Sequence, residues 1–162
     1  MLYSSFVLPH VMLHIEIWGA APAVYMRKLE IKNNMLLRSI LGVKYLNGIP
    51  VLDTASMYKQ LGVLNVNNVF KLRMFKFLVS LLKGFSSDFY DLLLRPYLFT
   101  HRYATRGSLL RHPLAACEVE RRSIAYQLVC LHDDVSTFLI DIDDKSLKTL
   151  VKTFKKHILS TQ

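Results

Sequence analysis

The sequence has few cysteines and no cysteine motif. Of its 162 residues only Cys117 and Cys130 are cysteines, and no Cys-x-x-Cys spacing occurs. So low a count excludes a disulfide framework and gives no zinc signature. A reducing environment is the default for such a chain. We therefore expect an intracellular protein of the nucleus or cytoplasm.

Recognisable catalytic patterns are also missing from the chain. It has no glycine-rich phosphate loop and no serine or cysteine nucleophile motif. His10 and His14 are four residues apart with Glu16 nearby, but they do not form a His-Glu-x-x-His pattern. A packed helix with polar edges is the simpler interpretation of these three residues. We expect no catalytic residue, no metal site and no cofactor.

Acidic residues are scarce relative to basic ones. The chain has 21 Lys and Arg against 12 Asp and Glu, a net charge of +9. Residues 1–117 are basic, residues 118–144 are acidic, and residues 145–162 contain five lysines and no acid. This excess favours a polyanionic partner, nucleic acid first and an acidic membrane surface second. Alternatively, the charge only solvates the surface, and the acidic stretch could pair with the last helix inside the fold.

The longest mostly apolar run covers residues 5–25. His10, His14 and Glu16 interrupt it, and Pro9 and Pro22 bracket it. A membrane span needs about 20 predominantly apolar residues with few charges. We therefore expect a buried helix here and no membrane partner, with a small membrane-associated protein as the minor alternative.

Apolar residues recur at helical spacing in most of the chain. This periodicity predicts helices over residues 9–18, 22–41, 53–61, 66–83, 87–93 and 145–162. Asp53 and Asn65 are suited to cap the third and fourth helices, and Asp143 or Asp144 the last. Residues 123–131 are ambiguous, and residues 135–140 fit either a strand or a helical turn.

The fold class that follows is mainly α. We predict a helical bundle of about five or six helices with a loop-rich, partly extended segment near residues 97–140. Residues 1–96 are predicted to form a helical body, and residues 97–144 an irregular segment with short extended pieces. Residues 145–162 form a C-terminal basic helix, and all three parts belong to one structural domain.

Several short blocks occur in an order that is more specific than any block alone. They are Trp18-Gly19, Asn33-Asn34 with Leu37-Arg38, Tyr58-Lys59-Gln60-Leu61-Gly62, His101 with Tyr103 and Thr105-Arg106, Arg122-Ser123-Ile124 with Tyr126, and Phe154-Lys155-Lys156. The series resembles the region C-terminal to the polymerase palm in reverse transcriptases of non-LTR retrotransposons of the jockey and RTE type. The resemblance covers nearly the whole chain, and residues 128–135 depart from the family pattern.

The resemblance implies a non-catalytic fragment of a reverse transcriptase. In that family an aromatic-x-Asp-Asp motif holds the catalytic metal ions, and it would lie upstream of this region. Asp133-Asp134 and Asp143-Asp144 lack that context, so we interpret them as a solvated loop and a helix cap. The implied partners are nucleic acid, either template RNA or target DNA, and the upstream polymerase domain of the same element.

Candidate binding residues come from two helices and one loop. They are Arg27, Lys28 and Arg38 in the first helix, Lys71, Arg73 and Lys76 in the second, and Arg102, Tyr103 and Arg106 in the loop. Lysine and arginine bind phosphates without regard to base sequence, and a tyrosine can stack on an unpaired base.

Alternatives remain for each of these groups. Tyr103 could pack inward while Arg106 pairs with Glu118 or Glu120. The lysines of the last helix are interpreted as a solubilising face, with phosphate binding as the alternative. The chain could also be a helical protein-protein interaction module, or the relic of a decayed element without independent activity.

Overall fold

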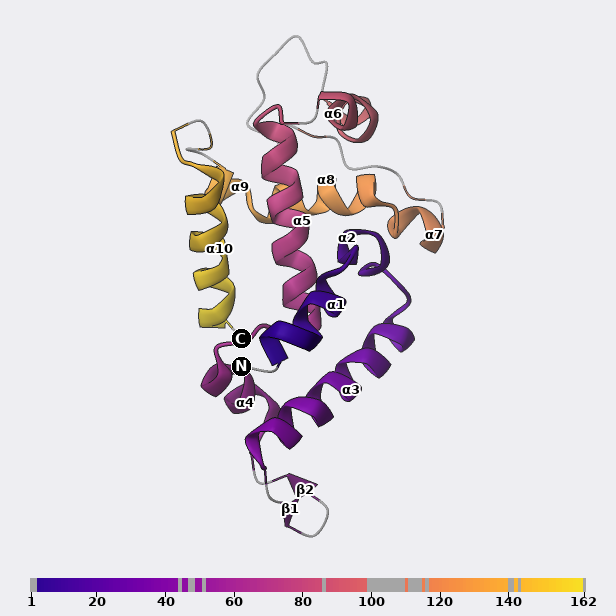
Figure 1. Cartoon of the computed structure of the whole chain (residues 1–162). Coiled ribbons are helices and arrows are strands. Elements are labelled where there is room, and N and C mark those ends of the chain that lie inside the picture. The colour runs from indigo at the N-terminus through magenta and orange to yellow at the C-terminus, as the bar shows by residue number, and fades with distance from the viewer. Residues whose placement is uncertain are drawn as a thin grey trace. The chain divides into compact units, whose positions relative to one another are not determined.

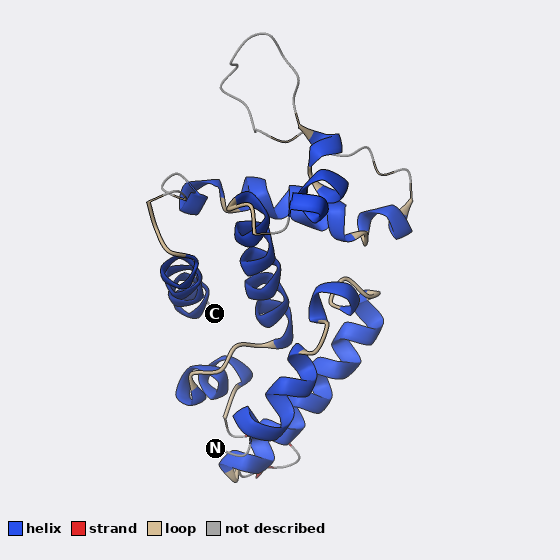
Figure 2. Ribbon diagram, turned by 45° about the horizontal axis from the view of Figure 1, so that its top comes forward, coloured by secondary structure: helices blue, strands red, loops and turns tan. Residues whose placement is uncertain are grey.

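The structure is a computed structural model that describes residues 3–43, 45–46, 49–50, 52–85, 87–98, 110, 115, 117–139, 142 and 144–161. Most of the described residues are helical, which confirms the prediction of a mainly α protein (Figures 1 and 2). The chain divides into two compact units. Unit 1 comprises Met1–Phe70 with Lys155–Gln162, and unit 2 comprises Lys71–Phe154.

Unit 1 begins with short helical pieces and continues with a long helix. A π-helical turn, Tyr3–Val7, is followed by α1 (Leu8–Met12), α2 (Ile15–Trp18), α3 (Ala23–Leu41) and α4 (Thr54–Leu61). The two-residue strands β1 (Tyr45–Leu46) and β2 (Ile49–Pro50) pair in antiparallel fashion between α3 and α4. The single buried helix predicted over residues 9–18 is wrong in two ways. His14 adopts a left-handed conformation with φ of 51° and separates α1 from α2, and Ile15 is the only buried residue of these two helices.

The predicted caps of two helices are confirmed. The Asp53 carboxylate accepts a hydrogen bond from the Ser56 amide at 3.4 Å, and Asn65 Oδ1 accepts one from the Asn68 amide at 2.8 Å. These bonds satisfy amides that would otherwise have no partner in the first turn. At the other end of α4, Gly62 has a φ of +62°, a conformation that disfavours any residue with a Cβ atom.

Unit 2 contains most of α5 (Val66–Leu82), followed by α6 (Ser87–Leu93) and a 3-10 turn, Arg95–Tyr97. Next come α7 (Glu118–Arg121), α8 (Ile124–Asp134), α9 (Ser136–Leu139) and most of α10 (Leu147–Thr161). The irregular segment predicted over residues 97–144 is therefore wrong for residues 118–139. Ser123 caps α8 by accepting from the Tyr126 amide, and Leu128, Val129 and His132 form one buried face.

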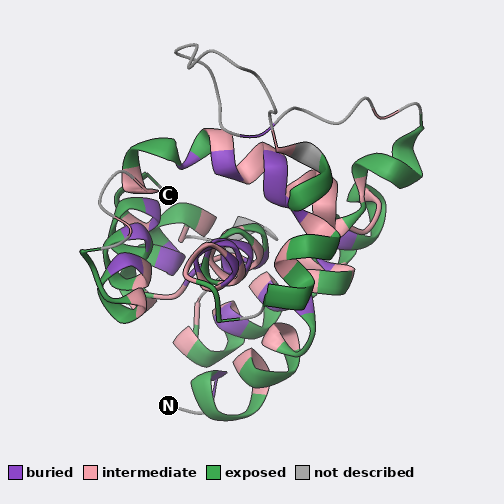
Figure 3. Ribbon diagram, turned by 90° about the horizontal axis from the view of Figure 1, so that it is seen from above, coloured by how far each residue is buried: buried purple, intermediate pink, exposed green. Residues whose placement is uncertain are grey.

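Between residues 99 and 114, where the sequence predicts an irregular segment with short extended pieces, the structure describes only Leu110. That residue is buried and forms an isolated antiparallel bridge with Leu98. The ambiguous stretch at residues 135–140 contains the helical turn α9 and no described strand. Along the longer helices α3, α8 and α10 buried residues follow one side and exposed residues the other, whereas α1, α6, α7 and α9 have no buried residue (Figure 3).

An aromatic cluster holds α10 against α5 in unit 2. The rings of Phe75 and Phe154 stack with their centroids 4.1 Å apart, and Phe138 meets Phe154 edge-on at 5.4 Å. Phe75 is fully buried, as are Leu78 and Val79 on the same helix. Within the described part of the chain, no helix has the length and apolar character needed to cross a bilayer.

Candidate nucleic-acid interface

The cations predicted on α3 divide into exposed and half-buried groups. Arg27 and Lys28 are exposed, and the Lys28 ammonium lies 5.9 Å from the centre of the Tyr25 ring. Arg38 is half-buried, and its Nη2 donates to Thr54 Oγ1 at 3.0 Å. Its Nε is buried and has no hydrogen-bond partner. Arg38 therefore connects α3 to α4, and less of its charge is available to a ligand than the sequence alone indicates.

The cations predicted on α5 do not form one row. Lys71 and Lys76 are exposed, but five residues at about 100° each place them roughly 140° apart around the helix. Arg73 is half-buried, and its Nε is buried without a hydrogen-bond partner. The α3 and α5 sets belong to different units, so each is considered by itself. The loop residues Arg102, Tyr103 and Arg106 lie outside the described residues.

The most regular cationic surface is on α10. Leu150, Phe154 and Ile158 are buried on one side of this helix. Four exposed lysines lie within about 100° of arc on another side: the first three are spaced about one turn apart, and the fourth directly follows the third. They are Lys148, Lys152, Lys155 and Lys156, which we call the lysine face. The helix contains no acidic residue, so no carboxylate of α10 itself neutralises them.

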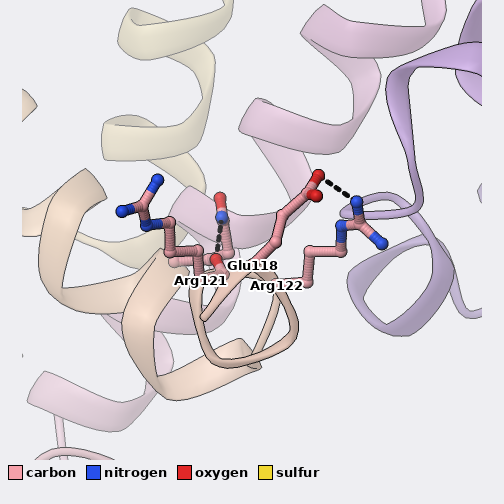
Figure 4. A network of polar contacts seen from close by, with 4 residues as sticks. Glu118, Arg121 and Arg122 are labelled. Atoms are coloured by element: carbon pink, nitrogen blue, oxygen red, sulfur yellow. Dashed lines mark hydrogen bonds and ion pairs between the residues drawn. The ribbon is translucent and has the colours of Figure 1, made fainter. Parts of the chain in front are cut away.

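The acidic stretch does not neutralise the lysine face within the described residues. There, two of its carboxylates have local contacts: Arg122 forms an ion pair with Glu118 one helical turn away, and His132 Nδ1 lies 3.4 Å from Asp133 Oδ1. Figure 4 shows the Arg122 guanidinium reaching the Glu118 carboxylate while that of Arg121 points away from it. In the described part of the chain, none of the four lysines has an ion-pair partner.

The start of α10 is defined by a serine and not by an aspartate. The Ser146 hydroxyl accepts a hydrogen bond from the Thr149 amide at 3.2 Å, which is the bond of an N-cap. The predicted cap by Asp144 is therefore wrong, and Asp143 lies outside the described residues. Because Ser146 starts the helix at Leu147, Lys148 falls in its first turn and begins the lysine face.

Residues from two of the motif blocks meet in the interior of unit 1. The Tyr3 hydroxyl donates to Asn33 Oδ1 at 3.1 Å, and Asn33 Nδ2 donates to the Tyr58 hydroxyl at 3.2 Å. The Tyr58 hydroxyl in turn donates to Asn34 Oδ1 at 2.5 Å. Tyr3, Tyr58 and Asn33 are all buried. Asn33-Asn34 and Tyr58 thus have a structural role, since the two asparagine side chains are hydrogen-bond partners of the Tyr58 hydroxyl inside unit 1.

Burial in this network affects both tyrosines. It raises the pKa of Tyr58 to about 12, and it also raises the pKa of Tyr3. Hydrogen bonds with Asn33 act in the opposite direction but are outweighed by the loss of solvation.

Stability is expected to fall between pH 10 and pH 12, and Tyr58→Phe should make that fall shallower. In the unfolded chain a tyrosine loses its proton near pH 10, whereas the folded state holds the Tyr58 proton until about pH 12. Stability is therefore fully present below pH 10 and decreases as the pH rises through this window. Urea unfolding at several pH values measures the effect. Tyr25→Phe, at an exposed position, is the matched control, and equal slopes for wild type and Tyr58→Phe would contradict the network.

Another motif glycine is explained by close packing. Gly19 is buried, and a Cβ atom there would overlap the ring of Phe70 and the carbonyl oxygen of Ile15. Its amide also donates to that carbonyl at 2.7 Å. The Trp18-Gly19 block therefore ends α2 at a point where only glycine lets the chain approach α5.

Groups suited to metal or covalent chemistry are not assembled in the described residues. Within that part of the chain, no three His, Cys, Asp or Glu side chains are placed to hold a metal ion. Cys117 and Cys130 are not joined in a disulfide. Burial raises the pKa of the Cys130 thiol, which favours its protonated form over a reactive thiolate.

The chain was also compared with known proteins. No protein-family model, no curated protein and no solved structure matches it.

Proposed function

We propose that the chain is a non-catalytic nucleic-acid-binding fragment of the type that follows the polymerase palm in non-LTR retrotransposon reverse transcriptases. The observation that carries the binding role is the lysine face, four exposed lysines without a carboxylate partner in the described structure. The retroelement origin is supported only by the ordered series of motif blocks. In that setting the chain supports the polymerase by holding template RNA or target DNA.

The lysine face is suited to phosphates and not to bases. Ammonium groups repeated about every turn of a helix, a rise of about 5.4 Å, can contact several phosphates of one strand. Each contact releases a counterion from the nucleic acid, so binding is independent of sequence and sensitive to salt. Arg27 and Lys28 on α3, and Lys71 and Lys76 on α5, add to the positive field of their units.

A salt titration tests this proposal. A fluorescently labelled RNA–DNA hybrid is titrated with the whole chain at increasing KCl, and fluorescence anisotropy gives the affinity. If four lysines bind phosphates, the logarithm of the association constant should fall with the logarithm of salt at a slope near −3 to −4. No binding at low salt, or affinity that does not change with salt, would contradict the proposal.

A second function, a helical module that binds protein, is favoured by one specific observation. Large apolar side chains are exposed on α3 and α6, including Ile31, Met35, Phe89 and Leu92. Exposed apolar patches of this kind mark surfaces that other molecules cover. Gel filtration and binding of an apolar dye test it: a clean monomer that binds no dye would argue against an exposed docking surface.

A further inference from the structure

The outward side of α3 combines apolar and basic side chains. Met26, Asn33 and Leu37 are buried on the inner side of this helix. On the outer side Val24 is 64% exposed, Ile31 50% and Met35 53%. Tyr25, Leu36 and Ile40 are exposed as well. Burying side chains of this size is worth roughly 1.5–3 kcal/mol each, so leaving several in water indicates a surface that a partner covers.

The spacing of these residues matches one kind of partner. Val24, Lys28, Ile31 and Met35 follow one another at intervals of four, three and four residues. This is the spacing of the contact seam in paired helices, where flanking charges select the partner. Arg27 and Lys32 flank the seam on its two sides, and both are exposed. Lys28 lies within the seam itself, and Glu30 is half-buried toward the inner side of the helix.

We propose that the outward side of α3 binds an acidic amphipathic helix of a partner protein. Such a helix would cover Val24, Ile31 and Met35 with its apolar stripe. Its glutamates or aspartates would pair with Arg27, Lys28 and Lys32 along the edges. One partner helix would then match both the apolar spacing and the basic flanks of α3.

Other occupants fit the same surface less well. A second copy of the chain would bring Lys28 and its flanking cations against identical cations, which opposes pairing. Nucleic acid would pair with the cations but leave Ile31 and Met35 facing phosphates. An anionic lipid surface suits the charge and the one-sided spacing, but it would place the Lys28 ammonium, which lies within the seam, toward the acyl chains.

Two designed peptides test the proposal on the whole chain. Both are helical with leucine along the seam over about four heptads; one has glutamate at the flanking positions and the other lysine. Fluorescence anisotropy should show the acidic peptide binding at least about tenfold more tightly than the basic one. Ile31→Asp should weaken binding of the acidic peptide by about tenfold or more. Ile17→Asp, on α2 and 66% exposed, should not change it.

A charge reversal makes the test specific for the flanks. Lys28→Glu combined with Lys32→Glu should invert the preference, so that the basic peptide binds more tightly than the acidic one. Circular dichroism confirms that each variant is folded, and the RNA–DNA hybrid titration should be unchanged in Ile31→Asp. If the wild-type chain did not bind the hybrid, the proposed function would be refuted, and the proposed helix-binding site on α3 would be unaffected. Equal binding of the two peptides overturns the inference, as does binding to anionic vesicles without peptide binding, or self-association that Ile31→Asp abolishes.

Discussion

Replacing the four residues of the lysine face together by glutamine is expected to weaken binding of an RNA–DNA hybrid by about 100-fold at low salt. The variant combines Lys148→Gln, Lys152→Gln, Lys155→Gln and Lys156→Gln. Each substitution removes one phosphate contact and its released counterion. The salt slope should therefore approach zero as the affinity falls. Fluorescence anisotropy across a KCl series measures both quantities in one experiment.

The fold should tolerate this variant. All four side chains are exposed, and glutamine has a helix propensity similar to that of lysine. Changes of this kind at the surface usually alter stability by less than about 0.5 kcal/mol. Circular dichroism and urea unfolding therefore provide the folding check, so that loss of binding cannot be attributed to loss of structure.

Two matched variants separate position from charge. Four arginines in place of the four lysines keep the charge and should retain the affinity within a few-fold. Glutamine at Lys32 and Lys59, two exposed lysines on other helices, removes charge elsewhere and should have a much smaller effect. If that control weakened binding as much as the four-lysine variant, net charge would explain binding and the lysine face would have no special role.

Helices and their caps were predictable from the sequence because their causes are local. The spacing of apolar residues predicts where α3, α4, α5 and α10 begin and end, with errors of no more than two residues. Asp53 and Asn65 act within three residues of themselves, so their roles could be inferred from neighbouring positions. The break at His14 was not predictable, since nothing in the local pattern requires a left-handed residue there.

The helix α7 was not predicted, and residues 123–131 and 135–140 were left ambiguous, because the apolar pattern of this part of the chain is short and weak. Ser123 provided a signal, since a serine followed by an apolar run is a common helix start. Ser146 was overlooked in the same way beside the more conspicuous Asp143 and Asp144. In both cases the serine hydroxyl accepts a hydrogen bond from the amide three residues later.

The cations were harder to assign because their environment depends on other elements. The Arg38 guanidinium donates a hydrogen bond to Thr54, which belongs to a different helix, and no rule of residue spacing predicts this contact. By contrast, the separation of Lys71 from Lys76 follows from five residues at about 100° each and could have been inferred from the sequence. The exposure of the α10 lysines could be predicted from periodicity, but whether a described carboxylate pairs with them depended on where residues 118–139 fold.

The lysine face depends in turn on the aromatic packing beneath it. Phe154 holds the inner side of α10 against Phe75 of α5, and Phe138 closes the cluster from α9. Because the buried side of a helix defines which side remains outside, these rings orient Lys148 and Lys152 toward solvent in unit 2. The orientation of the lysine face at the surface is therefore linked to the packing of these rings in the core.

Phe75→Ala is expected to reduce the free energy of unfolding by about 3–5 kcal/mol. The ring is fully buried, and its removal leaves a cavity as well as an unmatched face on Phe154. A loss of this size is a large fraction of the about 5–15 kcal/mol that stabilises an ordinary domain. Urea unfolding followed by circular dichroism measures it, with Phe85→Ala as the matched control because that side chain is 69% exposed.

A double-mutant cycle tests the contact itself. If the two rings stack as the structure has them, combining Phe75→Ala with Phe154→Ala should be less destabilising than the sum of the single substitutions, by about 0.5–1.5 kcal/mol. Phe85→Ala should stay within about 0.5 kcal/mol of wild type. Equal losses from Phe75→Ala and Phe85→Ala would show that α5 does not bury this ring, and the orientation of the lysine face would then lose its physical basis.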